Sequence, residues 1–127
     1  MVSAGQADLI LALEMQETLK SSYYTNQKTN FLINQFIQPI PLVKNLTENE
    51  IATALRKITK NVKIVPAEKT CQEKLGNSVV SGVYLLGFVV LKNLLPLKPA
   101  SITSAIKEIV PSQFLDLNLK AFNLAKS

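Results

Sequence analysis

The sequence contains no histidine, one cysteine and only four glycines among its 127 residues. Without histidine, the chain lacks the commonest general base, the commonest metal ligand and the side chain that titrates nearest neutral pH. Cys71 alone cannot close a disulfide within the chain or complete a multi-thiolate metal or iron–sulfur site. These absences remove the usual groups of catalytic and metal centres, and they favour a reducing, cytoplasmic setting.

No set of residues has the pattern of an active site. A phosphate-binding loop needs several glycines between a strand and a helix, and no glycine here has that position: Gly5, Gly76, Gly82, Gly87. Cys71 has no imidazole to activate it, so a structural thiol is predicted. Helix capping and solvation account for the carboxylates: Glu48, Glu50, Glu68, Glu73. The sequence therefore predicts no catalytic, cofactor-binding or metal-binding residue in this chain.

Charge is also scarce, at 18% of residues against a typical value of about 25%. Since 47% of the residues are hydrophobic, more surface than usual is expected to be covered by a partner. The net charge of +5 raises the question of nucleic acid. Lys57, Lys60 and Lys63 gather near Arg56, but no aromatic residues interleave with them, so a solvated face is predicted and no nucleic-acid partner.

No membrane partner is predicted either. The longest uncharged apolar run, residues 79–91, is too short to span a bilayer, which takes about 20 residues. Lys92 and Pro96 interrupt it before that length is reached. Residues 1–7 lack the positive start and apolar core of a signal peptide. A buried core helix is therefore the better interpretation of this run.

The first part of the chain, residues 1–75, alternates between strand-like and helix-like segments. Three segments have the apolar runs of buried strands: 7–13, 31–33 and 62–65. Helical segments are predicted at 14–24, after Thr47 and at 67–75. Alternation of this kind predicts an α/β fold, a parallel sheet of three-layer type with flanking helices.

Local signals mark where these helices begin and end. Thr47 followed by Glu50 forms a capping box, with the glutamate carboxylate reaching back to the threonine amide. Pro66 suits the first turn of the following helix, and Gly76 suits a left-handed cap after it. Residues 38–41 contain two prolines and predict an extended connection at a sheet edge or crevice.

The rest of the chain, residues 76–127, is predicted to be an all-helical tail within one domain that covers 1–127. A long helix from Ser78 to about Leu95 carries small residues among bulky ones. Glycine in a helix interior costs about 1 kcal/mol relative to alanine, so close approach of another backbone is expected. Two explanations remain open, packing within the domain and a subunit interface. The interface or packing residues are Gly76, Asn77, Ser81, Gly82, Gly87, Asn118 and Phe122.

Two shorter helices are predicted after Pro99. Ile102, Ile106 and Ile109 share one face of the first, which Pro111 ends. The second places Leu115, Leu119 and Phe122 on one side. Asp116 and Lys120 are four residues apart and are expected to pair.

An ordered set of short motifs resembles the gamma domain of 2-oxoacid:ferredoxin oxidoreductases, most closely the beta subunit of the indolepyruvate type. The motifs are Ala7–Glu14, Asn34, Pro39-Ile40-Pro41, Glu50-Ile51, Val65-Pro66-Ala67, Leu75-Gly76-Asn77, Leu85-Leu86-Gly87 and Asn118–Phe122. The resemblance covers nearly the whole chain. Compared with the family, the chain begins after the strand and glycine-rich turn of the form GxGGQG, and Ser81 replaces an asparagine of the long helix. It therefore resembles the C-terminal two thirds of the domain.

The resemblance implies a non-catalytic part of a subunit in a complex that decarboxylates a 2-oxoacid, forms an acyl-coenzyme A and reduces ferredoxin. In that family, thiamine diphosphate and iron–sulfur clusters are held mainly by other domains or subunits. No cofactor is therefore expected in this chain. Its partners would be the other subunits, with ferredoxin reached indirectly. The choice of 2-oxoacid, the partner subunit and the oligomeric state stay open.

Two other functions stay open beside the enzyme subunit. A truncated sheet would leave an unpaired edge and apolar faces, so the chain could be a self-associating scaffold without enzymatic activity. A small nucleic-acid binder would require salt-sensitive binding to duplex or single strands.

Overall fold

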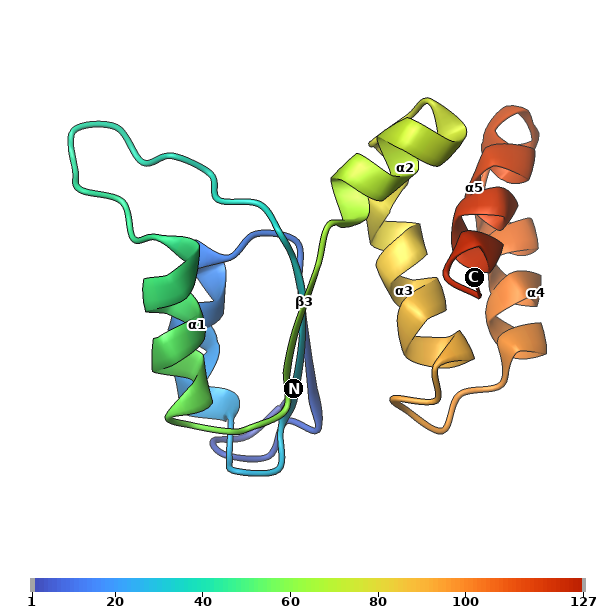
Figure 1. Ribbon diagram of the computed structural model, residues 1–127. Helices are drawn as coiled ribbons and strands as arrows, with labels where there is room; N and C mark the ends of the chain where they lie inside the picture. Colours follow the sequence, from blue (N-terminus) through green and yellow to red (C-terminus); the bar gives the residue numbers. More distant parts are fainter. Residues whose placement is uncertain (1, 127) are drawn as a thin grey trace. The chain divides into compact units, whose positions relative to one another are not determined.

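The computed structural model describes residues 2–126, which form two compact units divided between Pro66 and Ala67. The first unit contains all three strands of the described chain, and the second contains helices α2 to α5 (Figure 1). The parallel sheet, its flanking helices and the C-terminal helices confirm the predicted α/β class and the helical tail.

The sheet of the first unit is parallel throughout. Strands β1 (Leu9–Ala12), β2 (Asn30–Asn34) and β3 (Val62–Val65) lie in that order, with Leu11 opposite Leu32 and Ile33 opposite Ile64. The third strand has the predicted bounds. The first is shorter than the predicted 7–13, because the Ala7 amide donates to the Tyr24 carbonyl before the strand begins.

One face of the sheet carries the core of this unit. Alternate residues of each strand point to the same face, since side chains of a strand alternate with a period of two. Phe31 and Ile33 of β2 are buried there against Ile51 and Leu55 of helix α1 (Glu48–Arg56). Met15 adds a buried side chain to the same cluster. Helix α1 therefore buries an apolar face, formed by Ile51 and Leu55, on the sheet.

The connection from β1 to β2 is the 3₁₀ helix η1 (Gln16–Tyr24), not the ordinary helix that the pattern suggests. Three hydroxyls bond to the carbonyl three residues earlier: Thr18 to Met15, Ser21 to Thr18 and Thr25 to Ser22. Side chains that bond to the backbone in this way compete with the α-helical ladder. Such hydroxyl spacing explains the tighter helix.

Helix α1 begins where the capping box predicts. The Thr47 hydroxyl accepts a hydrogen bond from the Glu50 amide at 3.2 Å and donates to the Glu50 carboxylate at 3.2 Å. The sequence pattern predicts that the Glu50 carboxylate bonds to the Thr47 amide, but it bonds to the Thr47 hydroxyl instead. The bond from the Glu50 amide to the Thr47 hydroxyl, which caps the helix, is present.

Replacing Thr47 by alanine is expected to lower the free energy of unfolding by about 1 kcal/mol, because one amide of the first turn loses its acceptor. Thr53→Ala is the matched control, since Thr53 is exposed in the middle of the same helix. Urea unfolding followed by circular dichroism measures both. Equal effects of the two variants would show that the cap contributes nothing.

The second unit consists of α2 (Ala67–Leu75), α3 (Ser81–Leu91), α4 (Pro99–Ile109) and α5 (Ser112–Leu124). Helix α2 has the predicted bounds, and Gly76 follows it with a φ of 70°, which confirms the left-handed cap. Helix α3 packs against α2 and α5, and α5 also packs against α4. The order of these contacts makes α3 and α5 the centre of the unit.

Helix α3 is shorter than the predicted 78–95. The Asn77 side chain accepts from the Val79 amide at 2.9 Å, which forms a turn before the helix. At the other end Asn93 has a φ of 57°, a left-handed conformation that stops the helix. Asparagine adopts both conformations more readily than most residues, so these two side chains set the bounds.

The packing of α4 and α5 follows most of the sequence prediction. Ile102, Ile106, Leu115, Leu119 and Phe122 join one apolar cluster. The prediction for Ile109 is wrong, because 78% of its surface is exposed and the next residue, Val110, packs against the cluster instead. The predicted pair of Lys120 and Asp116 is present at 3.0 Å and solvent-exposed.

Candidate functional site

Two of the interface or packing residues, Gly87 and Phe122, meet inside the helical unit. A Cβ on Gly87 would lie 3.0 Å from both the Cα and the carbonyl carbon of Phe122, and closer still to its carbonyl oxygen. Phe122 itself is 1% exposed. Only a residue without a side chain lets α3 approach the backbone of α5 this closely.

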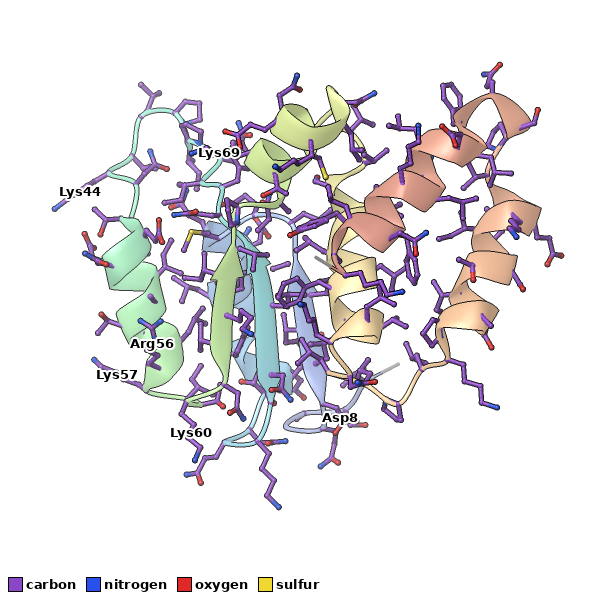
Figure 2. All side chains as sticks on the ribbon, turned by 45° about the vertical axis from the view of Figure 1, so that its right-hand side comes forward. Asp8, Lys44, Arg56, Lys57, Lys60 and Lys69 are labelled. Atoms are coloured by element: carbon purple, nitrogen blue, oxygen red, sulfur yellow. The ribbon has the colours of Figure 1, made fainter. Side chains whose placement is uncertain are left out.

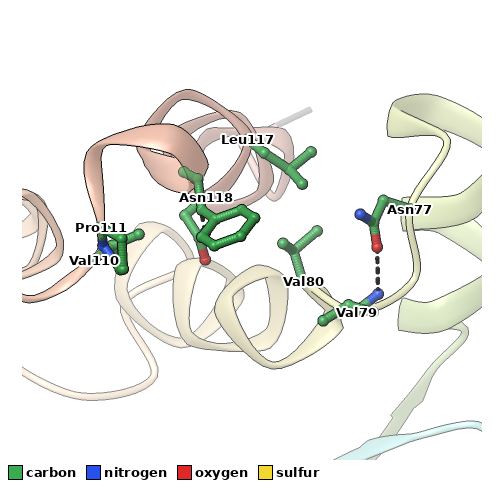
Figure 3. A pocket seen from close by; sticks show the side chains of 8 residues that line it. Asn77, Val79, Val80, Val110, Pro111, Leu117 and Asn118 are labelled. Atoms are coloured by element: carbon green, nitrogen blue, oxygen red, sulfur yellow. Dashed lines mark hydrogen bonds between the residues drawn. The ribbon is translucent and has the colours of Figure 1, made fainter.

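Asn77 and Asn118 both line an open pocket of the same unit (Figure 3). The pocket has a volume of about 420 Å³. Its other walls are apolar: Val79, Val80, Val110, Pro111, Phe114 and Leu117. Val79 is 87% exposed at the rim and Phe114 is 49% exposed.

The two asparagines give this pocket its polar groups. The Asn77 Oδ1 accepts from the Val79 amide, and the Asn118 Nδ2 donates to the Phe114 carbonyl at 2.9 Å. Within residues 2–126 this leaves the Asn77 Nδ2 as a donor and the Asn118 Oδ1 as an acceptor. An apolar lining with one donor and one acceptor suits an apolar group next to an amide.

The other three interface or packing residues lie apart from these pairs. Gly76 follows α2, with open space where a Cβ would be. Ser81 is buried as the first residue of α3, and its amide donates to the Ser78 carbonyl at 3.1 Å. Gly82 follows it in the same turn and is half-buried. The sequence pattern did not show which of the interface or packing residues meet.

Cys71 is fully buried on α2, in a cluster with Val80 and Ala121. Burial raises the pKa of its thiol, because the thiolate is disfavoured away from water. Burial also raises the pKa of the neighbouring Tyr84 phenol, the charge of Cys71 adds to this rise, and a hydrogen bond with Thr70 opposes it. A raised pKa is the opposite of what a nucleophilic cysteine needs.

The reactivity of Cys71 tests this reading. Thiol reagents attack the thiolate, so the labelling rate of the folded chain is expected to rise with pH to a midpoint above about 8.5, the ordinary value for a free thiol. Labelling in urea, where the residue is exposed, supplies the reference. A midpoint below the unfolded value would identify an activated thiol and contradict the prediction.

A polar network at the carboxyl end of the sheet escaped sequence reasoning. The Glu14 carboxylate follows β1 and accepts from the amides of Gln16 at 2.7 Å, Glu17 at 3.1 Å and Gln38 at 3.2 Å. Asn34 ends β2, is 1% exposed and donates to the Leu13 carbonyl at 3.1 Å. Their positions at or just beyond the carboxyl ends of two parallel strands were the available signal. These bonds hold the loops that follow the strands.

The basic residues of the first unit are solvated, as predicted. Arg56 and Lys57 end α1 and Lys60 lies in the turn after it (Figure 2). All three are exposed and make no ion pair within residues 2–126. Cations at a helix C-terminus are favoured by its partial negative charge. This local effect favours cations at the two positions that end α1, Arg56 and Lys57.

No helix among residues 2–126 has the length and apolar character required to cross a bilayer. In the same residues, histidine, cysteine, aspartate and glutamate nowhere form a group of three that could hold a metal ion.

The comparison with protein families identifies the chain. A sequence model described as pyruvate ferredoxin/flavodoxin oxidoreductase matches residues 1–127. The chain belongs to this family. Among its relatives are indolepyruvate oxidoreductase subunits IorB, from Archaeoglobus fulgidus with 30% identity and from Thermococcus kodakarensis with 31% identity. Each comparison covers 98% of this chain and 64% of the relative, so the chain spans somewhat less than two thirds of these relatives.

Two solved structures of oxidoreductase subunits share the fold. The gamma subunit of a keto/oxoacid ferredoxin oxidoreductase from Geobacter sulfurreducens has a TM-score of 0.66 at 20% identity, over 96% of this chain and 63% of that one. The pyruvate oxidoreductase subunit PORC from Thermotoga maritima has a TM-score of 0.55 at 18% identity, over 94% and 61%. At such identities the likeness establishes the fold.

The described residues do not fit the iron–sulfur clusters that this oxidoreductase family implies. A cluster is held by several thiolates, whereas the single Cys71 is buried and its pKa is raised. A diphosphate cofactor also has no glycine-rich loop to rest on in this sequence. No step of the chemistry is therefore assigned to residues of this chain.

Proposed function

We propose that this chain is a non-catalytic part of a subunit of a 2-oxoacid:ferredoxin oxidoreductase, with indolepyruvate as its 2-oxoacid. The complex would release carbon dioxide from the 2-oxoacid, transfer the acyl group to coenzyme A and pass the electrons to ferredoxin. Other subunits would hold thiamine diphosphate and the iron–sulfur clusters. The observation that carries the proposal is the family match over residues 1–127, joined by relatives that are indolepyruvate oxidoreductase subunits.

The positions of the thiol and the acidic side chains support a structural role. Its one thiol is buried, and its acidic side chains serve as caps and surface pairs, as Glu14 and Asp116 do. Of the interface or packing residues, we assign Gly87 and Phe122 to packing inside the helical unit. We assign the pocket of Asn77 and Asn118 to contact with another subunit, since both retain unused amide groups there.

Affinity capture of the tagged chain from its own cells tests the proposal. We expect a subunit that binds thiamine diphosphate and a subunit that carries iron–sulfur clusters in the captured material, together with ferredoxin reduction that depends on indolepyruvate and coenzyme A. Capture of the chain without any such subunit would contradict the proposal.

The second candidate is a self-associating scaffold without enzymatic activity. It is favoured by the order β1-β2-β3, which leaves both outer strands of the described sheet unpaired on one side. Leu11 and Leu13 are also exposed at the first of these strands. Exposed strand edges pair readily with other chains. Light scattering of the purified chain that shows a monomer at high concentration would exclude this candidate.

A further inference from the structure

The loop between β2 and α1 carries exposed apolar side chains at its tip. Residues 39–46, here called the 39–46 loop, extend away from the strands in Figure 1. Leu42 is fully exposed and Val43 is 56% exposed, with Ile40 and Leu46 partly exposed beside them. Clustered apolar side chains on a loop are more informative than single ones, because they mark surfaces that another molecule covers.

Side-chain hydrogen bonds give this loop a defined shape. The side-chain Oδ1 of Asn45 accepts from the backbone amide of Ile40 at 2.8 Å. The side-chain Nδ2 of Asn45 donates to the backbone carbonyls of Ile40 at 3.2 Å and Val43 at 3.4 Å. Gln16 donates to the Asn45 Oδ1 at 2.9 Å and to the Gln38 carbonyl at 2.9 Å. The loop is therefore held from within and from η1, and its apolar tip stays outside the core.

Leu42 has a φ of 65°, in the left-handed region. This conformation is uncommon for residues other than glycine and asparagine, because the Cβ crowds the backbone. A leucine that touches no core gains nothing from folding at such a position. Backbone strain that the surrounding structure maintains is typical of binding segments.

We infer that the 39–46 loop is a docking element for a partner subunit, an inference that rests on the proposed function. The partner would offer an apolar recess for Leu42 and Val43. Lys44, which follows Val43, is the only charged residue of the loop, and its side chain extends outward (Figure 2). Carboxylates at the rim of the recess would complement it. A preorganised loop loses little entropy on binding, so the bonds of Asn45 strengthen the contact.

Leu42→Gly separates docking from folding. Glycine accepts the positive φ without strain, so the thermal unfolding midpoint should not fall, although the apolar side chain is gone. Leu97→Gly is the matched control, because Leu97 is also an exposed leucine of a loop. Tagged chains with either change, and the unaltered chain, are captured from the source cells, and the thiamine diphosphate-binding subunit that accompanies them is quantified.

The expected result is at least about a 10-fold loss of that subunit with Leu42→Gly and none with Leu97→Gly, since a buried apolar anchor carries much of the binding energy. Lys44→Glu should also reduce capture. Equal capture by the unaltered chain and Leu42→Gly overturns this inference alone. Capture of no thiamine diphosphate-binding subunit by the unaltered chain overturns the proposed function as well.

Two further measurements distinguish other occupants of the loop. If the unaltered chain sediments with vesicles of phosphatidylcholine and phosphatidylserine, and Leu42→Gly does not, the loop inserts into lipid and the inference is wrong. A dimer that Leu42→Gly dissociates in light scattering would assign the loop to a second copy of this chain and would overturn it equally.

Discussion

Replacing Gly87 by alanine is expected to lower the free energy of unfolding of the helical unit by at least about 2 kcal/mol. The added Cβ would lie 3.0 Å from two backbone atoms of Phe122, and backbone cannot rotate aside as a long side chain can. Alanine has a higher helix propensity, by about 1 kcal/mol, which opposes the loss. The clash is expected to dominate. Urea unfolding monitored by circular dichroism measures the net effect.

Gly76→Ala is the comparison for this prediction. Gly76 has open space around its missing Cβ, so the substitution introduces only the strain of a side chain at a φ of 70°. Strain of this kind costs about 1 kcal/mol. Gly76→Asn should cost less, because asparagine tolerates the left-handed conformation. If Gly87→Ala were as stable as the unaltered chain, the close approach of α3 and α5 would be wrong.

Replacing Phe31 by alanine is expected to cost about 3–5 kcal/mol in the sheet unit, the range for a phenylalanine removed from a core. Phe31 lies on the central strand, is 1% exposed, and belongs to the cluster that joins the sheet to α1 and η1. Its removal would leave a cavity between these three elements. A loss of this size is comparable with the whole stability of a small domain.

Phe114→Ala provides the same chemical change on the surface. Phe114 is 49% exposed at the rim of the pocket, so its removal should cost less than about 1 kcal/mol. Thermal unfolding of the two variants beside the unaltered chain makes the comparison. A similar loss for both would mean that the sheet does not depend on the aromatic side chain at position 31.

The chain belongs to an oxidoreductase family, and the properties of its residues indicate which of its surfaces are candidates for a function. The thiol is buried and its pKa is raised. The conspicuous surfaces are the pocket of the helical unit and the 39–46 loop, both of which present apolar groups beside a few polar ones. Both surfaces suit the contacts with other subunits that we propose.

Local signals in the sequence predicted the helix starts and ends most accurately. Thr47 begins α1, Pro66 precedes α2, and the left-handed cap lies at Gly76 as expected. Each of these depends on the side chain or φ preference of one residue and on amides within a few positions of it. Such effects do not change with the packing of distant segments.

The sequence by itself determined the α/β class, the parallel sheet and the apolar face of α5, because the periodic pattern of apolar residues is local to each segment. Only the tertiary structure decided that Gly87 meets Phe122, that Asn77 and Asn118 line one pocket and that Asn45 shapes the 39–46 loop. The residues of each set are far apart in the sequence, or they contact one another only when a side chain adopts one particular rotamer. Their meeting depends on how helices and loops pack in space, which no local pattern encodes.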